Sequence, residues 1–251
     1  MRYMIMHKTS AYWETGPKPT PEVIQRVGGM VGEMIAAGVL TAGDGLAPSS
    51  QGARVRLAKG APSVTPGPFG GNGALPARYA LFRASTLDQA AEYAGRFGKI
   101  FGDVTVDVRP VNEAWDLGFA PKPEGLMTRR YMAIINADAA SEAGGPLGPE
   151  RTAALKRFTE DLEAAGMFIG IEHFEPGSKG KRLRPAAGAT GAAPAAKAKY
   201  IVMDGPFTET KELIGGFVTV EVPSIAEAVH WAQKYLEAVD TEEVDVRGLA
   251  G

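Results

Sequence analysis

The fold of this chain is predicted from one stretch of its sequence, Met203-Asp204-Gly205-Pro206-Phe207-Thr208-Glu209-Thr210-Lys211-Glu212-Leu213-Ile214-Gly215-Gly216-Phe217. The stretch begins with Asp-Gly-Pro, a run typical of a turn, because Gly permits positive φ and Pro fixes φ at about −65°. The Gly-Gly step at its end leads into a strand pattern. A reduced version, Thr65-Pro66-Gly67-Pro68-Phe69, occurs earlier in the chain. The stretch therefore indicates an internal repeat.

The repeat is supported by two constant offsets. Arg2-Tyr3-Met4 recurs as Arg130-Tyr131-Met132, an offset of 130 − 2 = 128. Gly67-Pro68-Phe69 recurs as Gly205-Pro206-Phe207, an offset of 205 − 67 = 138. The difference matches a flexible insertion rich in Ala, Pro and Gly at 185–198. We predict a tandem duplication, with one domain over 1–113, a linker over 114–128 and a second domain over 129–251.

Each copy shows the same order of predicted elements. A strand is followed by a helix that begins at Thr20-Pro21 and ends at Gly38, and a second helix begins at a capping box, Thr86 in one copy and Ser224 in the other. The order β-α-β-hairpin-β-α-β is that of a ferredoxin-like α+β unit. Two helices cover one face of such a sheet, so the open faces of the two copies are expected to pack together. The predicted fold is an intramolecular pseudo-dimer of two tandem ferredoxin-like domains.

The composition restricts the class of protein. The 251 residues carry a net charge of −2, which argues against a nucleic-acid binder. The absence of cysteine excludes disulfides and thiolate chemistry and suits a cytoplasmic location. The apolar run at the N-terminus is too short for a signal peptide or a membrane span.

The residues of the second copy resemble a known family. Asp204-Gly205-Pro206-Phe207, followed by Gly215-Gly216 and a later Val-x-Val-Arg, looks like the DGPF-domain family of bacterial YCII-related proteins. The resemblance implies a dimeric α+β-barrel fold with a pocket near the interface of two ferredoxin-like units. It implies no established activity: an acid-base role is suspected for relatives with a His-Asp pair, and gene neighbourhoods with extracytoplasmic-function sigma factors point to regulation. The first copy departs from the motif, since Pro66 stands where the second copy has Asp204.

Two candidate sites follow, and each has a structural alternative. Asp204 is a candidate acid or base at the turn, or it simply caps the turn. Lys211 beside it is a candidate anion ligand, or a solvated surface charge. His7 is the second candidate for catalysis, or a hydrogen-bonding group in the interface. The remaining candidate ligand-binding residues are Gly205, Phe207, Asp107, Arg109 and Arg247.

The second site rests on strand parity. Because the first and last strands of a ferredoxin-like sheet are neighbours, His7 is expected beside Asp107 or Arg109, with Tyr3 and His7 on the open face of the sheet. Arg83 and Glu221 occupy equivalent positions (221 − 83 = 138), which predicts that opposite charges pair the two open faces. His173 and His230 lie on other predicted elements, so no metal site is predicted.

The predicted function is the binding of an unidentified small molecule in a pocket between the sheet faces. Its activity would be of a proton-transfer or lyase type and would need no metal or organic cofactor. The alternative is a regulatory or interaction module without catalysis, associated with a sigma factor. No nucleic acid or membrane partner is expected, and both a monomer and a further dimer are compatible with the internal pair.

Overall fold

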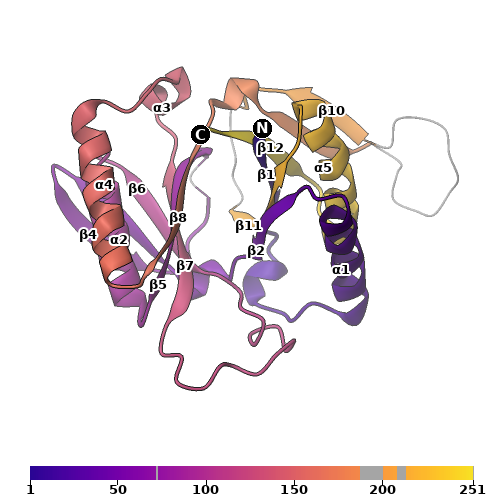
Figure 1. The fold of residues 1–251 in the computed structure, drawn as a ribbon, viewed down its shortest axis with the longest axis horizontal. Helices are drawn as coiled ribbons and strands as arrows, with labels where there is room; N and C mark the ends of the chain where they lie inside the picture. Colours follow the sequence, from indigo (N-terminus) through magenta and orange to yellow (C-terminus); the bar gives the residue numbers. More distant parts are fainter. Residues whose placement is uncertain (72, 187–199, 208–212, 251) are drawn as a thin grey trace, which may run out of the picture.

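The structure, a computed structural model, describes residues 1–71, 73–186, 200–207 and 213–250. It is an α+β fold in which a 12-stranded sheet is antiparallel at every pairing and curls on itself, with the long helices on its outer faces (Figure 1). Two halves of this sheet face each other. Half 1 has the order β2-β11-β1-β12 and is extended by β9 and β10; half 2 has the order β8-β5-β7-β6-β3-β4.

The strands of half 1 are β1 (Arg2–Lys8), β2 (Leu40–Gly45), β9 (Lys181–Pro185), β10 (Tyr200–Asp204), β11 (Ile214–Glu221) and β12 (Val244–Ala250). The strands of half 2 are β3 (Ala53–Ala58), β4 (Ala61–Pro66), β5 (Pro76–Ala84), β6 (Thr105–Pro110), β7 (Arg129–Asn136) and β8 (Phe168–Phe174). The α-helices are α1 (Pro21–Ala36), α2 (Leu87–Lys99), α3 (Ala139–Ala143), α4 (Pro149–Ala164) and α5 (Ile225–Val239). Short 3₁₀ helices are η1 (Trp13–Thr15), η2 (Ser49–Gln51) and η3 (Gly177–Lys179).

Each half of the sheet contains strands from both sides of the 114–128 segment. β1 from the N-terminal part pairs with β11 and β12 from the C-terminal part, and β7 pairs with β5 and β6 in the same way. The expectation that β1 and β6 are neighbours was wrong, because β12 takes that place: Met6 lies opposite Asp245, not beside Asp107. The strand pairing therefore crosses the predicted boundary at 114–128.

Two junctions join the halves. At one, β12 pairs with β8 through Leu249–Phe174 and Ala250–His173. At the other, an isolated bridge links Leu46 to Val111. The junctions occupy equivalent positions, since 46 + 128 = 174 and 111 + 138 = 249. The same offsets relate α1 to α4, η2 to η3 and the two cis Gly-Pro bonds, 67–68 and 205–206.

Apolar residues fill three layers. Tyr3 and Ile5 of β1 pack with α1 and α5 on the outside of half 1, whereas Met4 and Met6 face half 2, where they meet residues such as Met132. The outside of half 2 is packed against α2 and α4. The open faces do pack together, but the expected parity of β1 was wrong: the alternation places His7 on the helix side with Tyr3 and Ile5.

The predicted helix boundaries are confirmed by their caps. The Thr20 side chain accepts from the Val23 amide at the start of α1, and Gly38 beyond its end has a φ of 69°. Thr86 and Ser224 cap α2 and α5 in the same way. Each cap satisfies an amide that the helix itself leaves free. Among the described residues, no helix has the length and apolar character needed to cross a membrane.

Charged pairs join the two halves, but they are not the predicted one. In the described part of the chain Arg83 and Glu221 form no ion pair. Arg2 of β1 pairs instead with Glu172 of β8, and Arg130 of β7 pairs with Asp44 of β2 at 2.9 Å. These two pairs occupy equivalent positions, because 2 + 128 = 130 and 44 + 128 = 172. Opposite charges thus do pair across the two halves, but on strands next to the ones that were predicted.

Candidate functional site

The Gly-Pro-Phe turn has a structural role in both parts of the chain. A Cβ added to Gly205 would lie 1.9 Å from the carbonyl oxygen of Gly177, and one added to Gly67 would lie 1.8 Å from that of Ser49. The turn therefore presses its backbone against a 3₁₀ helix at a distance that only glycine allows. Gly205 is therefore a packing residue at this contact.

Phe207 also has an intramolecular partner. The guanidinium of Arg182 lies over its ring at 4.4 Å from the centroid, and Arg182 Nε donates to buried Asp245 at 2.6 Å. Phe69, Arg54 and Asp107 repeat this arrangement, at 4.7 Å from the ring and 2.6 Å to the carboxylate. Cation–π stacking and a charge-assisted hydrogen bond thus connect the turn to the last strand of each repeat.

Asp204 lies at the end of β10, three strands from β1, and its exposed side chain forms an ion pair with Lys181. Asp204 does not line the pocket of about 550 Å³ that contains His7. Lys211 lies outside the described residues. The structure does not bring Asp204 and His7 together in one site.

The two buried arginines of the prediction differ in their contacts. Arg109 donates to the carbonyl oxygens of Ala47 and Ile214 at 2.8 Å and 2.5 Å and pairs with Glu14 at 3.2 Å. Arg247, 1% exposed, donates to the carbonyl oxygen of Glu175. Burial lowers the pKa of both guanidinium groups. Both arginines tie a strand of the sheet to a neighbouring loop.

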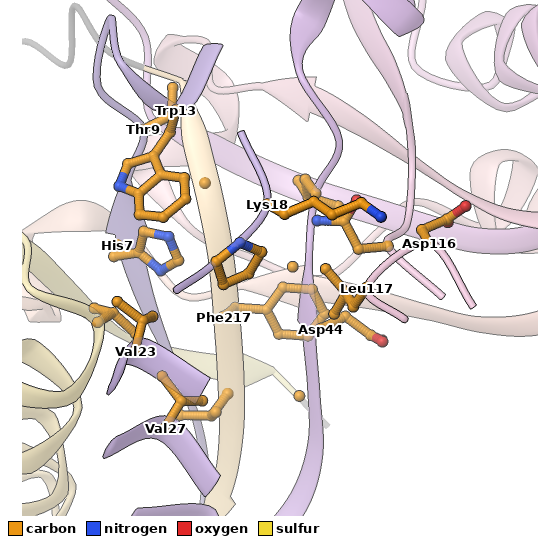
Figure 2. Close-up of a pocket in the computed structure, with 18 of the residues that line it drawn as sticks. His7, Thr9, Trp13, Lys18, Val23, Val27, Asp44, Asp116, Leu117 and Phe217 are labelled. Atoms are coloured by element: carbon orange, nitrogen blue, oxygen red, sulfur yellow. The ribbon is translucent and has the colours of Figure 1, made fainter. Parts of the chain in front are cut away.

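A pocket of about 550 Å³ lies between α1, the helix side of half 1 and the segment that connects β1 to α1 (Figure 2). Its apolar wall is formed by α1 and by strand residues, including Val23, Val27, Met30 and Phe217. This differs from the prediction of a pocket between the sheet faces, where the structure instead has an apolar cluster and a cavity of about 30 Å³. The volume of the large pocket is that of a small-molecule site.

His7 lines this pocket on a floor made of two glycines. A Cβ on Gly215 would lie 2.6 Å from His7 Nε2, and one on Gly216 would lie 2.8 Å from its Cε1. On the other side, His7 Nδ1 lies 2.8 Å from the hydroxyl oxygen of Tyr235 on α5. Figure 2 shows the imidazole between the indole of Trp13 and Val23. The Gly-Gly step singled out in the sequence therefore makes room for the imidazole.

The surroundings keep the imidazole neutral. Burial, with the nearby positive charges of Arg109 and Lys8, lowers the pKa of His7 to about 4. Burial also raises the pKa of Tyr235, so its hydroxyl keeps its proton. A neutral imidazole that is hydrogen-bonded to a protonated Tyr can form a hydrogen bond with a ligand while neither side chain carries a charge.

Polar residues occupy the opposite side of the pocket, where Figure 2 shows Lys18, Asp44 and Asp116. Burial raises the pKa of Asp44, and its pairing with Arg130 opposes this shift. Asp116 pairs with Arg129 at 2.8 Å. None of these residues was predicted from the sequence. Asp44 lies on the edge strand β2, Asp116 follows Pro110 and Lys18 precedes α1, and these segments carry no motif.

The equivalent position in half 2 is filled by side chains. The offsets place His173 where the pocket has Gly45 and Arg78 where Gly216 lies against His7. They also place Phe101 at the position of Val239 and Phe158 at that of Met30. The Arg78 guanidinium lies 3.9 Å from the Phe101 ring centroid, and Phe158 stacks on Phe97 at 5.6 Å. Small residues in half 1 thus leave space that large residues occupy in half 2.

Metal ligands do not converge in the described part of the chain, where no group of three or more His, Asp or Glu residues could hold an ion. The pocket instead offers an apolar wall, the paired carboxylates of Asp44 and Asp116, and Lys18 around one imidazole.

Comparisons with known proteins gave one family match and one relative. Residues 130–246 match the model of the YCII-related domain. A protein of Rhizobium meliloti (strain 1021), named as uncharacterised, is 36% identical over 103 residues, which cover 38% of this chain and 75% of that relative. No solved structure gave a significant match.

Proposed function

We propose that this chain, which belongs to the YCII-related family, binds a small organic molecule in the pocket at His7. The observation that carries the proposal is a cavity of about 550 Å³ lined by an apolar wall and by an imidazole whose Nε2 has no hydrogen-bond partner among the described residues. A large apolar pocket with a few convergent polar groups and a residue of shifted pKa is the usual form of a binding or active site.

The chemistry that suits this pocket is hydrogen-bond or proton transfer to the bound molecule. Neutral His7 is the candidate group, and Asp44, whose pKa is raised, is a second proton carrier across the pocket. A neutral imidazole can accept a proton, and a carboxyl group of raised pKa can donate one. A proton-transfer or lyase-type reaction is the activity that we propose to test first.

The wider arrangement of the chain is part of this proposal. We regard 1–113 and 129–251 as two YCII-related copies of the DGPF type whose sheets exchange strands in a barrel-like pseudo-dimer, in the cytoplasm. Only the pair of copies completes the pocket, since His7 comes from the first and Gly215 and Tyr235 from the second. Catalysis by Asp204 and a regulatory role beside a sigma factor are the alternatives. The first predicts ligand binding independent of this pocket, and the second predicts no small-molecule ligand.

A thermal-shift screen against a few hundred metabolites tests the proposal. The informative variant combines Met30→Phe with Val239→Phe, which places in the pocket the side chains that fill the equivalent position of half 2. The control is Ile35→Phe, on the same helix at an exposed position (63%). A ligand at about 100 times its Kd should stabilise the wild type and the control by roughly 2.7 kcal/mol.

The double variant should lose this shift. Compounds that stabilise all three proteins equally bind elsewhere and contradict the proposal. A screen without stabilising compounds favours the regulatory alternative.

A further inference from the structure

We propose that the molecule bound in the pocket presents an oxygen acceptor, a carbonyl or carboxylate oxygen, to an N–H group at Nε2 of His7. The inference deepens the proposed function and rests on it. It names the ligand as a carbonyl or carboxyl compound with an apolar body.

The hydroxyl of Tyr235 determines which nitrogen carries the hydrogen. Tyr235 is buried (3% exposed), and its only hydrogen-bond partner in the described part of the chain is His7 Nδ1. If Nδ1 carried the hydrogen, the Tyr235 hydroxyl would have to accept it, and its own hydrogen would be buried without an acceptor. Leaving a buried donor unpaired is unfavourable, so Tyr235 donates to Nδ1 and the hydrogen lies on Nε2.

The other nitrogen lies beside a residue of the pocket wall. Nε2 lies above Gly215, which also lines the pocket, and has no hydrogen-bond partner among the described residues. Without a side chain at Gly215, space remains beside this nitrogen. The Nε2–H group is therefore the hydrogen-bond donor that His7 offers to a bound molecule.

The N–H group selects an acceptor at this position. A ligand oxygen can accept its hydrogen bond, whereas an ammonium or other pure donor finds no acceptor on this nitrogen. The wall of Val23, Val27 and Met30 suits an apolar body attached to that oxygen.

The tautomer can be measured without knowing the ligand. The chain has three histidines, so the imidazole nitrogens of a ¹⁵N-histidine sample give few signals, and His7→Gln identifies those of His7. We expect the neutral form with hydrogen on Nε2 down to about pH 5. Tyr235→Phe should mix the two tautomers, and Tyr93→Phe, a tyrosine of α2, should not. A predominant Nδ1–H form in the wild type overturns the inference. Phe97 of α2 occupies the position equivalent to Tyr235, which indicates that α5 tolerates Tyr235→Phe.

Matched compounds then test the ligand class. Each set contains a ketone, the corresponding carboxylate, an amine and a hydrocarbon with the same apolar body. We expect the ketone or the carboxylate to bind about tenfold more tightly than the hydrocarbon and to shift the Nε2–H signal. The preferred member of the pair identifies the acceptor.

The outcomes separate the two proposals. If hydrocarbons or amines bind as well as the oxygen compounds, and still lose binding in Met30→Phe/Val239→Phe, the proposed function stands and the acceptor inference is wrong. If no compound of any set depends on the pocket, the proposed function is wrong, and the inference about the ligand falls with it.

Discussion

Gly215 supports the imidazole of His7, so adding a single methyl group at Gly215 should disturb this contact. Gly215→Ala places a Cβ 2.6 Å from His7 Nε2, so the ring or the strand must shift. We expect a loss of about 1–3 kcal/mol in the free energy of unfolding and a loss of ligand binding. Urea unfolding measures the first. The control is Gly170→Ala in β8, where the added Cβ meets no atom within 4 Å; equal costs for both variants would contradict the proposed contact.

His7 also predicts a dependence of stability on pH. Its pKa is about 4 in the folded chain, below the unfolded value of about 6.5, so between these values the unfolded chain binds the additional proton. Stability should therefore fall as the pH is lowered from about 6.5 to 4, by about 2–3 kcal/mol from this group.

The measurement is the difference in unfolding free energy between wild type and His7→Gln across this range. The difference should shrink toward acid pH. His230→Gln, at an exposed position on α5, controls for the loss of a histidine as such. A difference independent of pH would show that His7 is not held neutral by the fold.

At the scale of elements, the ion pairs packed against the two Gly-Pro-Phe turns differ in their burial. Asp245 is 1% exposed and binds both Arg182 and Lys8, whereas Asp107 binds Arg54, whose side chain is 23% exposed. Asp245→Asn leaves buried Lys8 without its carboxylate and Arg182 paired with Glu243, and should cost about 3–5 kcal/mol. Asp107→Asn should cost about 1–3 kcal/mol, because solvent reaches its partner. Chemical denaturation of the two variants compares them, and equal costs would contradict this assignment.

The turn itself allows a second comparison. Asp204→Ala removes an exposed ion pair and should change stability by less than about 1 kcal/mol. Gly205→Ala places a Cβ on the Gly177 carbonyl and should destabilise by several times as much, about 2–4 kcal/mol. Thermal unfolding measures both. A large effect of Asp204→Ala on ligand binding, with stability unchanged, would instead support a functional Asp204.

The sequence was informative wherever local chemistry decides the outcome. Thr20, Thr86 and Ser224 begin helices because their side chains accept helix amides, and Gly38 ends one because it adopts positive φ. The alternation of β6 placed Asp107 and Arg109 correctly, opposite Val106 and Val108. For β1 alternation left two choices, since Met4 and Met6 are as apolar as Tyr3 and Ile5, and the face chosen was wrong.

Strand exchange and the pocket could not be predicted in this way. The last strands of the two predicted copies have the same sequence pattern, so this pattern allows β1 to pair with β6 or with β12, and the structure pairs it with β12. The pocket depends on glycines, because Gly43, Gly45, Gly215 and Gly216 have no side chains that would fill it or displace His7. The Gly-Gly step was visible in the sequence, but its function as the floor beneath His7 needed the tertiary contact.

For the whole molecule, the central claim is that two equivalent halves contain one ligand site, at His7. Half 2 closes its equivalent position with Arg78, Phe101 and His173. Titration calorimetry of the most stabilising compound tests this most directly. We predict one molecule bound per chain, with no binding in Met30→Phe/Val239→Phe and unchanged binding in Ile35→Phe. Two molecules per chain, or binding that survives the filled pocket, would contradict the account.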